Sequence, residues 1–319
     1  MTQQRPTKDP KKIVVVGGGM GGLASAARLA KLGHHVSLYE AADRFGGKCR
    51  TETINGYSFD VGPSLLTLPA VYRDLFLKTG KRIEHLLKID PVDPAFTYIF
   101  HDGKRVQFPN LSHSGTVKAI TESFGAESGA AWHAILARAE RMWDASREDF
   151  IENELRPFSF LKRKNFFLDL FTIAPWKSLR SLTHTYSQDP YLSKIIDRYA
   201  TYTGSDPRKV PAVLLTIAFV EEAFGAWHIQ GGLGRLAVEI SKRCGDLGVE
   251  LHLQSPVTRI ITRENTAIGI ELQSGARIEA DIVIANADAE YLYNSLLPQT
   301  LKTKKPRAAL QKATPSLSG

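Results

Sequence analysis

Three glycines in the spacing Gly17-x-Gly19-x-x-Gly22 have the chemistry to bind the pyrophosphate of a dinucleotide. Their backbone can approach the phosphates closely, and a helix that begins there directs free N–H groups toward the anion. Glu40 follows about 20 residues later, where a carboxylate can accept hydrogen bonds from an adenosine ribose. That carboxylate would repel a 2′-phosphate, which argues against an NADP-type ligand. The alternative is a tight turn that binds no ligand.

The elements needed to position these groups follow one another in the sequence. Residues 13–16 are apolar and mostly β-branched, which is typical of a buried parallel strand. Leu23, Ala27 and Ala30 give the next segment one apolar helical face, and Gly33 can end that helix. A second strand is expected over residues 36–39. Because strand, turn, helix, strand and acid occur in this order, we favour a dinucleotide site over an empty turn.

A second glycine pair, Gly46 and Gly47, comes shortly after the ribose acid. Two glycines there allow the backbone to pass near a phosphate or a ring system, and Arg44 and Lys48 could lie near the pyrophosphate. From the residue types alone, a solvent-exposed turn explains this segment equally well.

Residues 17–40, 43–51 and 56–66 together resemble the flavoprotein amine oxidase superfamily. Three later segments narrow the resemblance to the bacterial and fungal type of carotenoid desaturase, which includes phytoene and diapophytoene desaturases. They are residues 202–212, 226–236 and 281–290. The resemblance covers roughly residues 12–319. It departs at Ile229, where many members have proline, and at the end of the chain, because full-length members continue further and complete the flavin site there. A C-terminally truncated chain is therefore expected.

The resemblance implies FAD as the cofactor and, by its match to these motifs, a set of cofactor-binding residues. They are Gly17, Gly19, Met20, Gly22, Glu40, Arg44, Gly46, Gly47, Lys48, Gly62, Pro63, Ser64 and Val257. The backbone of Val257 would meet the adenine, although by residue type Val257 is simply a core valine.

The expected fold class is α/β: a Rossmann-like FAD-binding domain of the amine oxidase type with an inserted, mainly helical substrate or membrane domain. Residues 1–11 are expected to be disordered, 12–100 and 226–297 to form the FAD-binding domain, 101–225 the insertion, and 298–319 a disordered tail. The expected helices are 117–124, 130–149, 190–202, 212–224 and 236–247. The expected later strands are 249–253, 257–262, 268–272, 277–280 and 282–285, with a hairpin turn at Ser274 and Gly275.

Composition favours an intracellular globular protein. The chain has 319 residues, 43% of them hydrophobic, and contains no apolar run long enough to cross a bilayer. The polar N-terminus lacks the apolar core of a secretory signal. Cys49 and Cys244 are too few for a disulfide framework, and neither they nor the nine histidines, His34 and His35 included, show a metal-ligand spacing. We expect a cytoplasmic protein associated peripherally with membranes, and no metal.

The net charge of +8 suggests an anionic partner. No nucleic-acid-binding motif is visible. Residues 156–180 contain six basic residues and one acidic residue, interleaved with Phe158, Phe160, Phe166, Phe167, Phe171 and Trp176. This pattern favours contact with a membrane surface, where an apolar polyene substrate would be dissolved. The alternative is an amphipathic helix packed on the protein's own core. The oligomeric state stays open, a homo-oligomer included.

The reaction implied by the resemblance is desaturation, with hydride passing to the flavin and a proton leaving the neighbouring carbon. Quinone or oxygen would reoxidise the flavin. The catalytic residues are unknown: Asp144, Arg147 and Asp149 suit a solvated ion-pair face, and Glu221 and Glu222 suit either a helix end or a position near the flavin. Two other functions stay open. One is an amine oxidase-type flavoprotein with an aromatic cage, for which Tyr57, Tyr202 and Trp227 are available, and the other is an inactive flavin-fold fragment.

Overall fold

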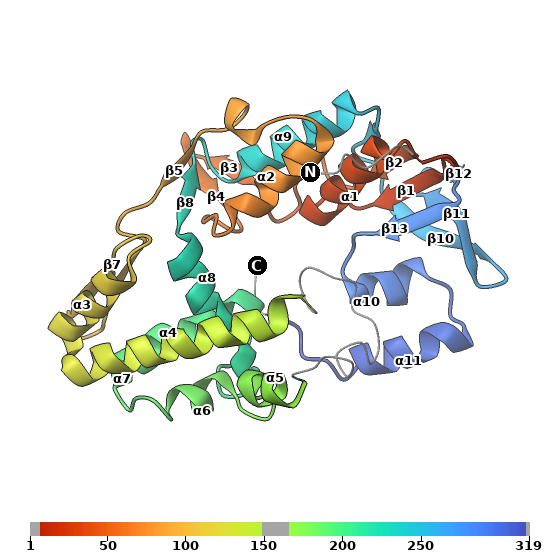
Figure 1. Cartoon of the computed structure of the whole chain (residues 1–319). Coiled ribbons are helices and arrows are strands. Elements are labelled where there is room, and N and C mark those ends of the chain that lie inside the picture. The colour runs from red at the N-terminus through yellow and green to blue at the C-terminus, as the bar shows by residue number, and fades with distance from the viewer. Residues whose placement is uncertain (1–6, 149–165, 317–319) are drawn as a thin grey trace. The chain divides into compact units, whose positions relative to one another are not determined.

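The chain forms two compact units in a computed structural model that describes residues 7–148 and 166–316 (Figure 1). Unit 1 comprises Met1–Asp90 and His228–Thr314, and unit 2 comprises Pro91–Trp227 and Pro315–Gly319. The sequence placed the first boundary at residue 100. The structure assigns residues 91–100 to unit 2, because Phe96 and Tyr98 pack against the core of that unit.

Unit 1 is built on a four-stranded parallel sheet with the strand order β13-β1-β2-β9. The strands are β1 (Lys12–Val16), β2 (His35–Tyr39), β9 (Glu250–His252) and β13 (Ile282–Ala285). The central strand β1 pairs Val15 with Leu38 of β2 and with Ile284 of β13. Ile13 to Val16 are all buried, as expected of a strand that is covered on both faces.

The side chains of successive residues of β1 point to opposite faces of this sheet. Val14 and Val16 pack with Ile260 and Ile270 of an antiparallel three-stranded sheet. That sheet consists of β10 (Val257–Arg263), β11 (Thr266–Leu272) and β12 (Arg277–Glu279). Helix α1 (Met20–Lys31) packs against β2 and against α9 (Gly234–Asp246). The hairpin between β11 and β12 turns at Gly275, as predicted.

The remaining elements of unit 1 include several that the sequence did not indicate. They are β3 (Thr51–Ile54), β4 (Tyr57–Asp60), α2 (Pro69–Thr79), Ile83–His85, α10 (Ala289–Tyr291), the π-helical turn Leu292–Leu296 and α11 (Leu301–Leu310). β5 (Ile89–Pro91) and β8 (Trp227–Ile229) pair where the chain passes between the units.

Both ends of the described chain are more ordered than the sequence indicated. Thr7 N–H donates to the Leu32 carbonyl, and the Lys11 carbonyl accepts from His35, so residues 7–11 are tied to the end of α1 and the start of β2. Near the other end, α11 begins with a capping box between Thr300 and Thr303. Such reciprocal hydrogen bonds satisfy donors at a helix start, which explains a helix within a weakly patterned segment.

Unit 2 is mainly helical, as expected. Its elements are β6 (Phe96–Ile99), β7 (Arg105–Phe108), α3 (His113–Phe124), α4 (Ala126–Arg147), α5 (Phe166–Ile173), α6 (Leu179–Thr183), α7 (Pro190–Asp197), Arg198–Thr203, Ala212–Leu215 and α8 (Thr216–Phe224). Their ends follow known capping chemistry: the Asp189 carboxylate accepts from the first N–H groups of α7, and Ser178 forms a capping box at α6.

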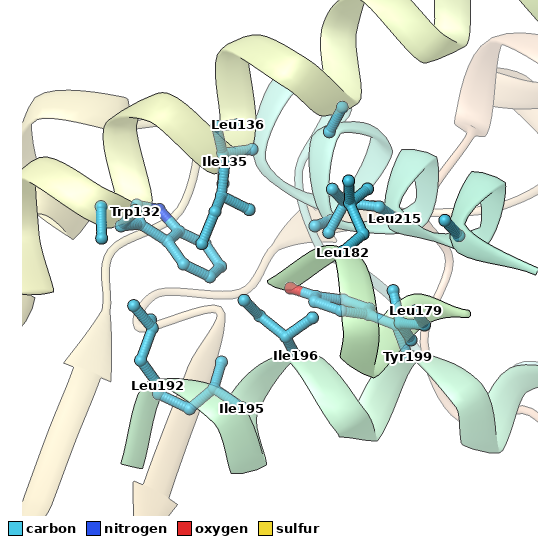
Figure 2. Packing of buried hydrophobic residues seen from close by; sticks show 14 of the residues in the cluster. Trp132, Ile135, Leu136, Leu179, Leu182, Leu192, Ile195, Ile196, Tyr199 and Leu215 are labelled. Atoms are coloured by element: carbon cyan, nitrogen blue, oxygen red, sulfur yellow. The ribbon is translucent and has the colours of Figure 1, made fainter. Parts of the chain in front are cut away.

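The core of unit 2 is made of side chains from several helices. Ile135 from α4, Leu192 and Ile196 from α7, and Leu215 are fully buried and point toward one another (Figure 2). Trp132 lies beside them and its ring packs on Phe108.

Candidate functional site

The glycine-rich turn joins β1 to α1 and is held by main-chain contacts. Gly17 has a φ of +95° and donates its N–H to the Tyr39 carbonyl at the end of β2. A Cβ on Gly22 would lie 2.1 Å from the Gly17 carbonyl oxygen, so only glycine allows the helix to start this close to the strand. Helix α1 has no side-chain cap and no acidic residue in its first turn. The turn therefore presents the positive end of a helix.

Glu40 lies directly beside this turn. Its Oε2 accepts from Gly18 N–H at 2.6 Å and its Oε1 from Ala42 N–H at 2.9 Å. The two bonds fix the carboxylate at the end of β2, next to the glycine-rich turn.

The segment after β9 continues alongside Glu40. The Glu40 carbonyl accepts from Ser255, and the rings of Tyr39 and His252 stack with 4.5 Å between their centroids. Val257 begins β10 only two residues further on, with its side chain in the core beneath the sheet. The structure thus brings the chain near Val257 to the Glu40 end of the site, and Val257 is also the core valine that its residue type indicated.

The second glycine pair lies against the first. Gly46 N–H donates to the Gly18 carbonyl at 2.8 Å, and Gly46 forms an isolated parallel bridge with Gly19. A Cβ on Gly47 would come within 3.2 Å of the Gly19 Cα. Two segments separated by more than twenty residues therefore form one glycine-lined surface with α1.

The predicted basic residues, Arg44 and Lys48, flank the second glycine pair in the sequence. The Arg44 guanidinium pairs with Asp43 at 3.0 Å and with Glu52 at 3.3 Å. The hydrogen bond with Asp43 raises the pKa of Arg44 and lowers that of Asp43. Arg44 lines a hollow of about 320 Å³ together with Arg50 and Arg235. Lys48 contributes its backbone, since its carbonyl lies where a Cβ on Gly62 would fall.

Gly62, Pro63 and Ser64 follow strand β4, which ends at Asp60. Asp60 is the residue that ties this part of the chain together: its Oδ2 accepts from Leu233 N–H at 2.8 Å and its Oδ1 from the Thr51 hydroxyl at 2.6 Å. It thereby fastens the turn containing Gly231 and Gly232 to the β3–β4 hairpin.

Sequence reasoning missed Asp60 and also Asn286. Asn286 follows β13 and donates Nδ2–H to the Gly17 carbonyl at 3.2 Å. Its main-chain N–H donates to Val16. A usable signal was present, because a polar residue directly after an apolar parallel strand lies at the edge of the sheet where the glycine-rich turn also lies.

The turn and its neighbours can be compared with what the adenosine diphosphate half of a dinucleotide requires. Cβ atoms on Gly17, Gly21 or Gly22 would collide with the Asn286 or Gly17 groups that shape the turn. The first turn of α1 has uncapped N–H groups, and one carboxylate, Glu40, lies beside it. These residues fit a pyrophosphate and an adenosine ribose. Met20 is the first residue of α1, at the same helix end.

The candidate catalytic residues of unit 2 fall into different environments. Glu221 is almost fully buried and pairs with Arg198, while Tyr202 donates its hydroxyl to the same carboxylate. Glu222 interacts with His113 and accepts from Trp132 Nε1 at 3.1 Å. Asp144 is exposed on α4, Arg147 ends that helix, and Asp149 lies outside the described residues.

The aromatic residues considered for an amine cage also have assigned positions. Tyr57 is 71% exposed in unit 1, whereas Tyr202 and Trp227 belong to unit 2. Trp227 donates its Nε1–H to the Phe224 carbonyl. The guanidinium of Arg198 lies 5.9 Å from the centroid of the Tyr202 ring. This ring therefore already has a cation of the protein beside it, where an amine cage would place the cation of a ligand.

Part of the predicted membrane-contact segment, residues 156–165, lies outside the described residues. In the part that is described, Phe167, Leu168, Phe171 and Trp176 are each more than half exposed. The rings of Phe171 and Trp176 contact each other edge to face. None of the helices in residues 7–148 and 166–316 is long and apolar enough to span a bilayer.

Both cysteines are buried within unit 1 as free thiols. Burial raises the pKa of Cys49 to about 11 and that of Cys244 to about 12. Thiols this reluctant to ionise are poor nucleophiles at neutral pH. Over the described residues, His, Cys, Asp and Glu do not gather in threes that could hold a metal ion.

Comparison with known proteins identifies the kind of chain that carries this site. A family profile described as "Flavin containing amine oxidoreductase" matches residues 20–317. The 4,4'-diapolycopene oxygenase of Methylomonas sp is 28% identical over 98% of this chain and 62% of the relative. The hydroxyneurosporene desaturase of Cereibacter sphaeroides is 34% identical over 87% and 56%, and the zeta-carotene-forming phytoene desaturase of Myxococcus xanthus is 30% identical over 94% and 58%.

Solved structures with the same fold support the architecture. A variant of putrescine oxidase superposes with a TM-score of 0.66 at 19% identity, over 93% of this chain and 62% of that one. An oxidoreductase from Methanosarcina mazei superposes with a TM-score of 0.65 at 19% identity, over 94% and 64%. The predicted α/β fold with a Rossmann-like dinucleotide-binding part is thereby confirmed. The chain spans about three fifths of the length of the relatives it matches.

Proposed function

Because this chain belongs to the family of flavin-containing amine oxidoreductases, we propose that it is the FAD-binding part of an enzyme that desaturates an apolar carotenoid precursor. The family and the relatives confirm the resemblance predicted from the sequence and support FAD as the cofactor. One observation supports the proposal above all: two glycine segments and Glu40 lie together on one surface in a chain whose relatives are carotenoid desaturases and oxygenases.

The residues of the chain would bind and orient the cofactor. The uncapped start of α1 would face the pyrophosphate, and Glu40 would accept from the ribose hydroxyls. Gly46 and Gly47 would let the chain pass close to the cofactor, and Arg44 would add positive charge at the border. When bound, the flavin supplies the hydride acceptor for C–H oxidation. The substrate is expected to be a long polyene such as phytoene or diapophytoene, with quinone or oxygen as the final acceptor.

Unit 2 would receive the substrate at a membrane surface. Each CH₂ left in water costs about 0.8 kcal/mol, so a long hydrocarbon stays in the bilayer and the protein must reach it there. The exposed side chains of Phe167, Leu168, Phe171 and Trp176 suit shallow insertion among lipid headgroups, beside the basic residues Lys177 and Arg180.

Cofactor binding is the first test. We expect the purified chain to bind FAD, detected by its absorbance and by the flavin released on denaturation. Glu40→Gln should weaken FAD binding by about tenfold, because it replaces a charged acceptor by an amide. Glu279→Gln, an exposed change on β12, should leave the affinity unaltered. A folded chain that takes up no added FAD would refute the proposal for this chain.

Membrane contact can be tested separately by flotation with liposomes containing anionic lipid. The chain should float, and a Phe167→Ser, Phe171→Ser, Trp176→Ser variant should remain in the bottom fraction. Anaerobic bleaching of the flavin by phytoene, but not by putrescine, would then separate a carotenoid desaturase from an amine oxidase. Bleaching by the amine alone would favour the second function.

A further inference from the structure

One carboxamide fills the space beside the glycine-rich turn of unit 1. Asn286 follows β13, and its main-chain N–H donates to the Val16 carbonyl, so strand pairing places it at the end of β1. Its Nδ2–H donates to the Gly17 carbonyl at 3.2 Å, across 269 positions of sequence. Because a carbonyl oxygen only accepts hydrogen bonds, this contact settles which end of the carboxamide is nitrogen. Oδ1 then faces the first turn of α1, on the side of Gly21.

The glycines of this turn lack β-carbons at the places where Asn286 lies. A Cβ on Gly21 would lie 2.7 Å from Oδ1 of Asn286, and Cβ atoms on Gly19 and Gly22 would each lie 3.1 Å from its Nδ2. A Cβ on Gly17 would lie 2.4 Å from the main-chain oxygen of Asn286. The four glycines and this one residue are therefore complementary in shape, and Asn286 takes part in holding the conformation of the turn.

The carboxamide also brings no charge to the start of α1. That helix has no side-chain cap and no acidic residue in its first turn, so the positive end of its dipole is not neutralised by a side chain of its own. A carboxylate in the place of the carboxamide would lie at this positive end and repel a bound anion. Glu40, the carboxylate beside the turn, is instead engaged by the N–H groups of Gly18 and Ala42.

We propose that Asn286 is a positioning residue for the dinucleotide: its carboxamide holds the glycine turn in the conformation that receives the pyrophosphate, and its neutrality keeps the start of α1 free for that anion. The inference rests on the proposed function, because it assigns a role toward FAD to a residue outside the glycine motif. It goes beyond that function in stating that the charge at position 286, and not only the packing there, determines the affinity for the cofactor.

Two variants of position 286 separate charge from packing. Asn286→Ala and Asn286→Asp both remove the donor to the Gly17 carbonyl, and only the second adds a negative charge. In titrations of the whole chain followed by flavin fluorescence, Asn286→Asp should bind FAD about tenfold more weakly than Asn286→Ala does. This difference should shrink as salt is added, because salt screens the repulsion. Equal affinities in the two variants would leave Asn286 a packing residue only and would overturn the proposal.

Stability in urea tests the assigned contact without any cofactor. Gly21→Ala should lower the urea midpoint of the wild-type chain, because the new Cβ meets Oδ1 of Asn286. In a chain that already carries Asn286→Ala this oxygen is absent, and the same substitution should not lower the midpoint. Gly245→Ala, which has no heavy atom within 4 Å of the added group, should shift both midpoints alike. A Gly21→Ala effect of the same size in both chains would contradict the contact and the inference with it.

The failure of this inference can be told apart from the failure of the proposed function. If the wild-type chain takes up no FAD, the proposed function fails, and the role of Asn286 toward FAD fails with it. If the wild-type chain binds FAD and the two variants of position 286 bind it equally well, only the inference about Asn286 fails.

Discussion

The two units build their sites in opposite ways. In unit 1 the glycine turn, Gly46 and the end of β2 meet through main-chain atoms, and the site exists because side chains are missing. In unit 2 the polar groups are side chains from separate helices, and that unit has an apolar core of its own (Figure 2). Glu221 and Arg198 form an ion pair there, with the guanidinium over the rings of Phe96 and Tyr199. Glu222 is hydrogen-bonded to His113 and Trp132.

This difference predicts where each unit is vulnerable. A site made of backbone fails when an added atom enters it, and the damage depends on the space available at that one position. A site made of buried polar side chains fails when one partner is removed, because the other is left without compensation. An added side-chain atom should therefore damage unit 1, whereas the removal of one partner of a buried polar pair should damage unit 2.

The largest effect is expected from breaking the buried ion pair of unit 2. Arg198 lies within 4.6 Å of the Phe96 and Tyr199 ring centroids, and Glu221 is only 3% exposed. Arg198→Met leaves that carboxylate buried and unpaired, and should lower the free energy of unfolding by about 3–5 kcal/mol in urea denaturation. A double variant that adds Glu221→Leu should recover much of the loss.

The matched control is an exposed pair. Lys118 and Glu122 lie 3.8 Å apart with 75% and 66% of their side chains exposed. Lys118→Met should change stability by less than about 0.5 kcal/mol. If both variants cost the same, the buried pair is not what holds this part of unit 2.

Adding one methyl group should damage unit 1 nearly as much. In Gly22→Ala the new Cβ would lie 2.1 Å from the Gly17 oxygen, so α1 must move away from β1. We expect a loss of about 3 kcal/mol and of FAD binding, followed by denaturation and absorbance. Gly245→Ala on α9 has no heavy atom within 4 Å of the new group and should instead stabilise by about 0.5–1 kcal/mol. If both variants lost similar stability, the collision of the new Cβ with the Gly17 oxygen would not be the cause of the loss in Gly22→Ala.

Unit 1 also contains a test of the opposite kind, since Asp60, like Glu40 and Asn286, is one of the side chains that hold its main-chain segments together. Asp60→Ala removes the acceptor for Leu233 N–H and for the Thr51 hydroxyl, and should cost about 1–3 kcal/mol in thermal denaturation. Asp60→Asn retains one acceptor oxygen and should lose less. If Asp60→Ala unfolds as the wild type does, backbone contacts alone suffice to assemble this unit.

The smallest effect concerns the buried cysteines. Burial raises the pKa of Cys49 from 9.0 to about 11. The folded state therefore holds the thiol proton more tightly than the unfolded state, so this stabilisation is complete below pH 9 and is lost as the pH rises toward 11. Cys49→Ala should make the fall in stability across that interval shallower than in the wild type. In the folded chain, iodoacetamide should leave both cysteines unmodified at pH 8; rapid labelling would contradict their burial.

Much of unit 1 could be predicted from local pattern. The strand expected at residues 282–285 is β13, the strand expected at 13–16 is β1 with one further residue, and Gly33 follows the end of α1. An apolar run or a glycine acts on its immediate neighbours, so such signals survive without knowledge of the fold. After residue 298 disorder was expected, but Leu301–Leu310 form helix α11. The capping box between Thr300 and Thr303 is a local signal for that helix, and the sequence analysis did not use it.

Other features escaped because their partners are distant in the sequence. The β3–β4 hairpin leaves even its large apolar side chains Ile54, Tyr57 and Phe59 exposed. Asp60 acquires its role only when Leu233 lies beside it. Asn286 likewise matters only once β13 has paired with β1.

By itself, the sequence determined that a glycine-rich turn follows the first strand and that an acid follows the second, because glycine spacing and strand ends are local properties of the backbone. Only the tertiary structure decided that Glu222, His113 and His133 form one polar chain, and that Arg198 lies against Glu221. His113 and Glu222 are 109 positions apart. Whether two such side chains meet depends on how helix faces pack against one another, and no local spacing encodes that packing.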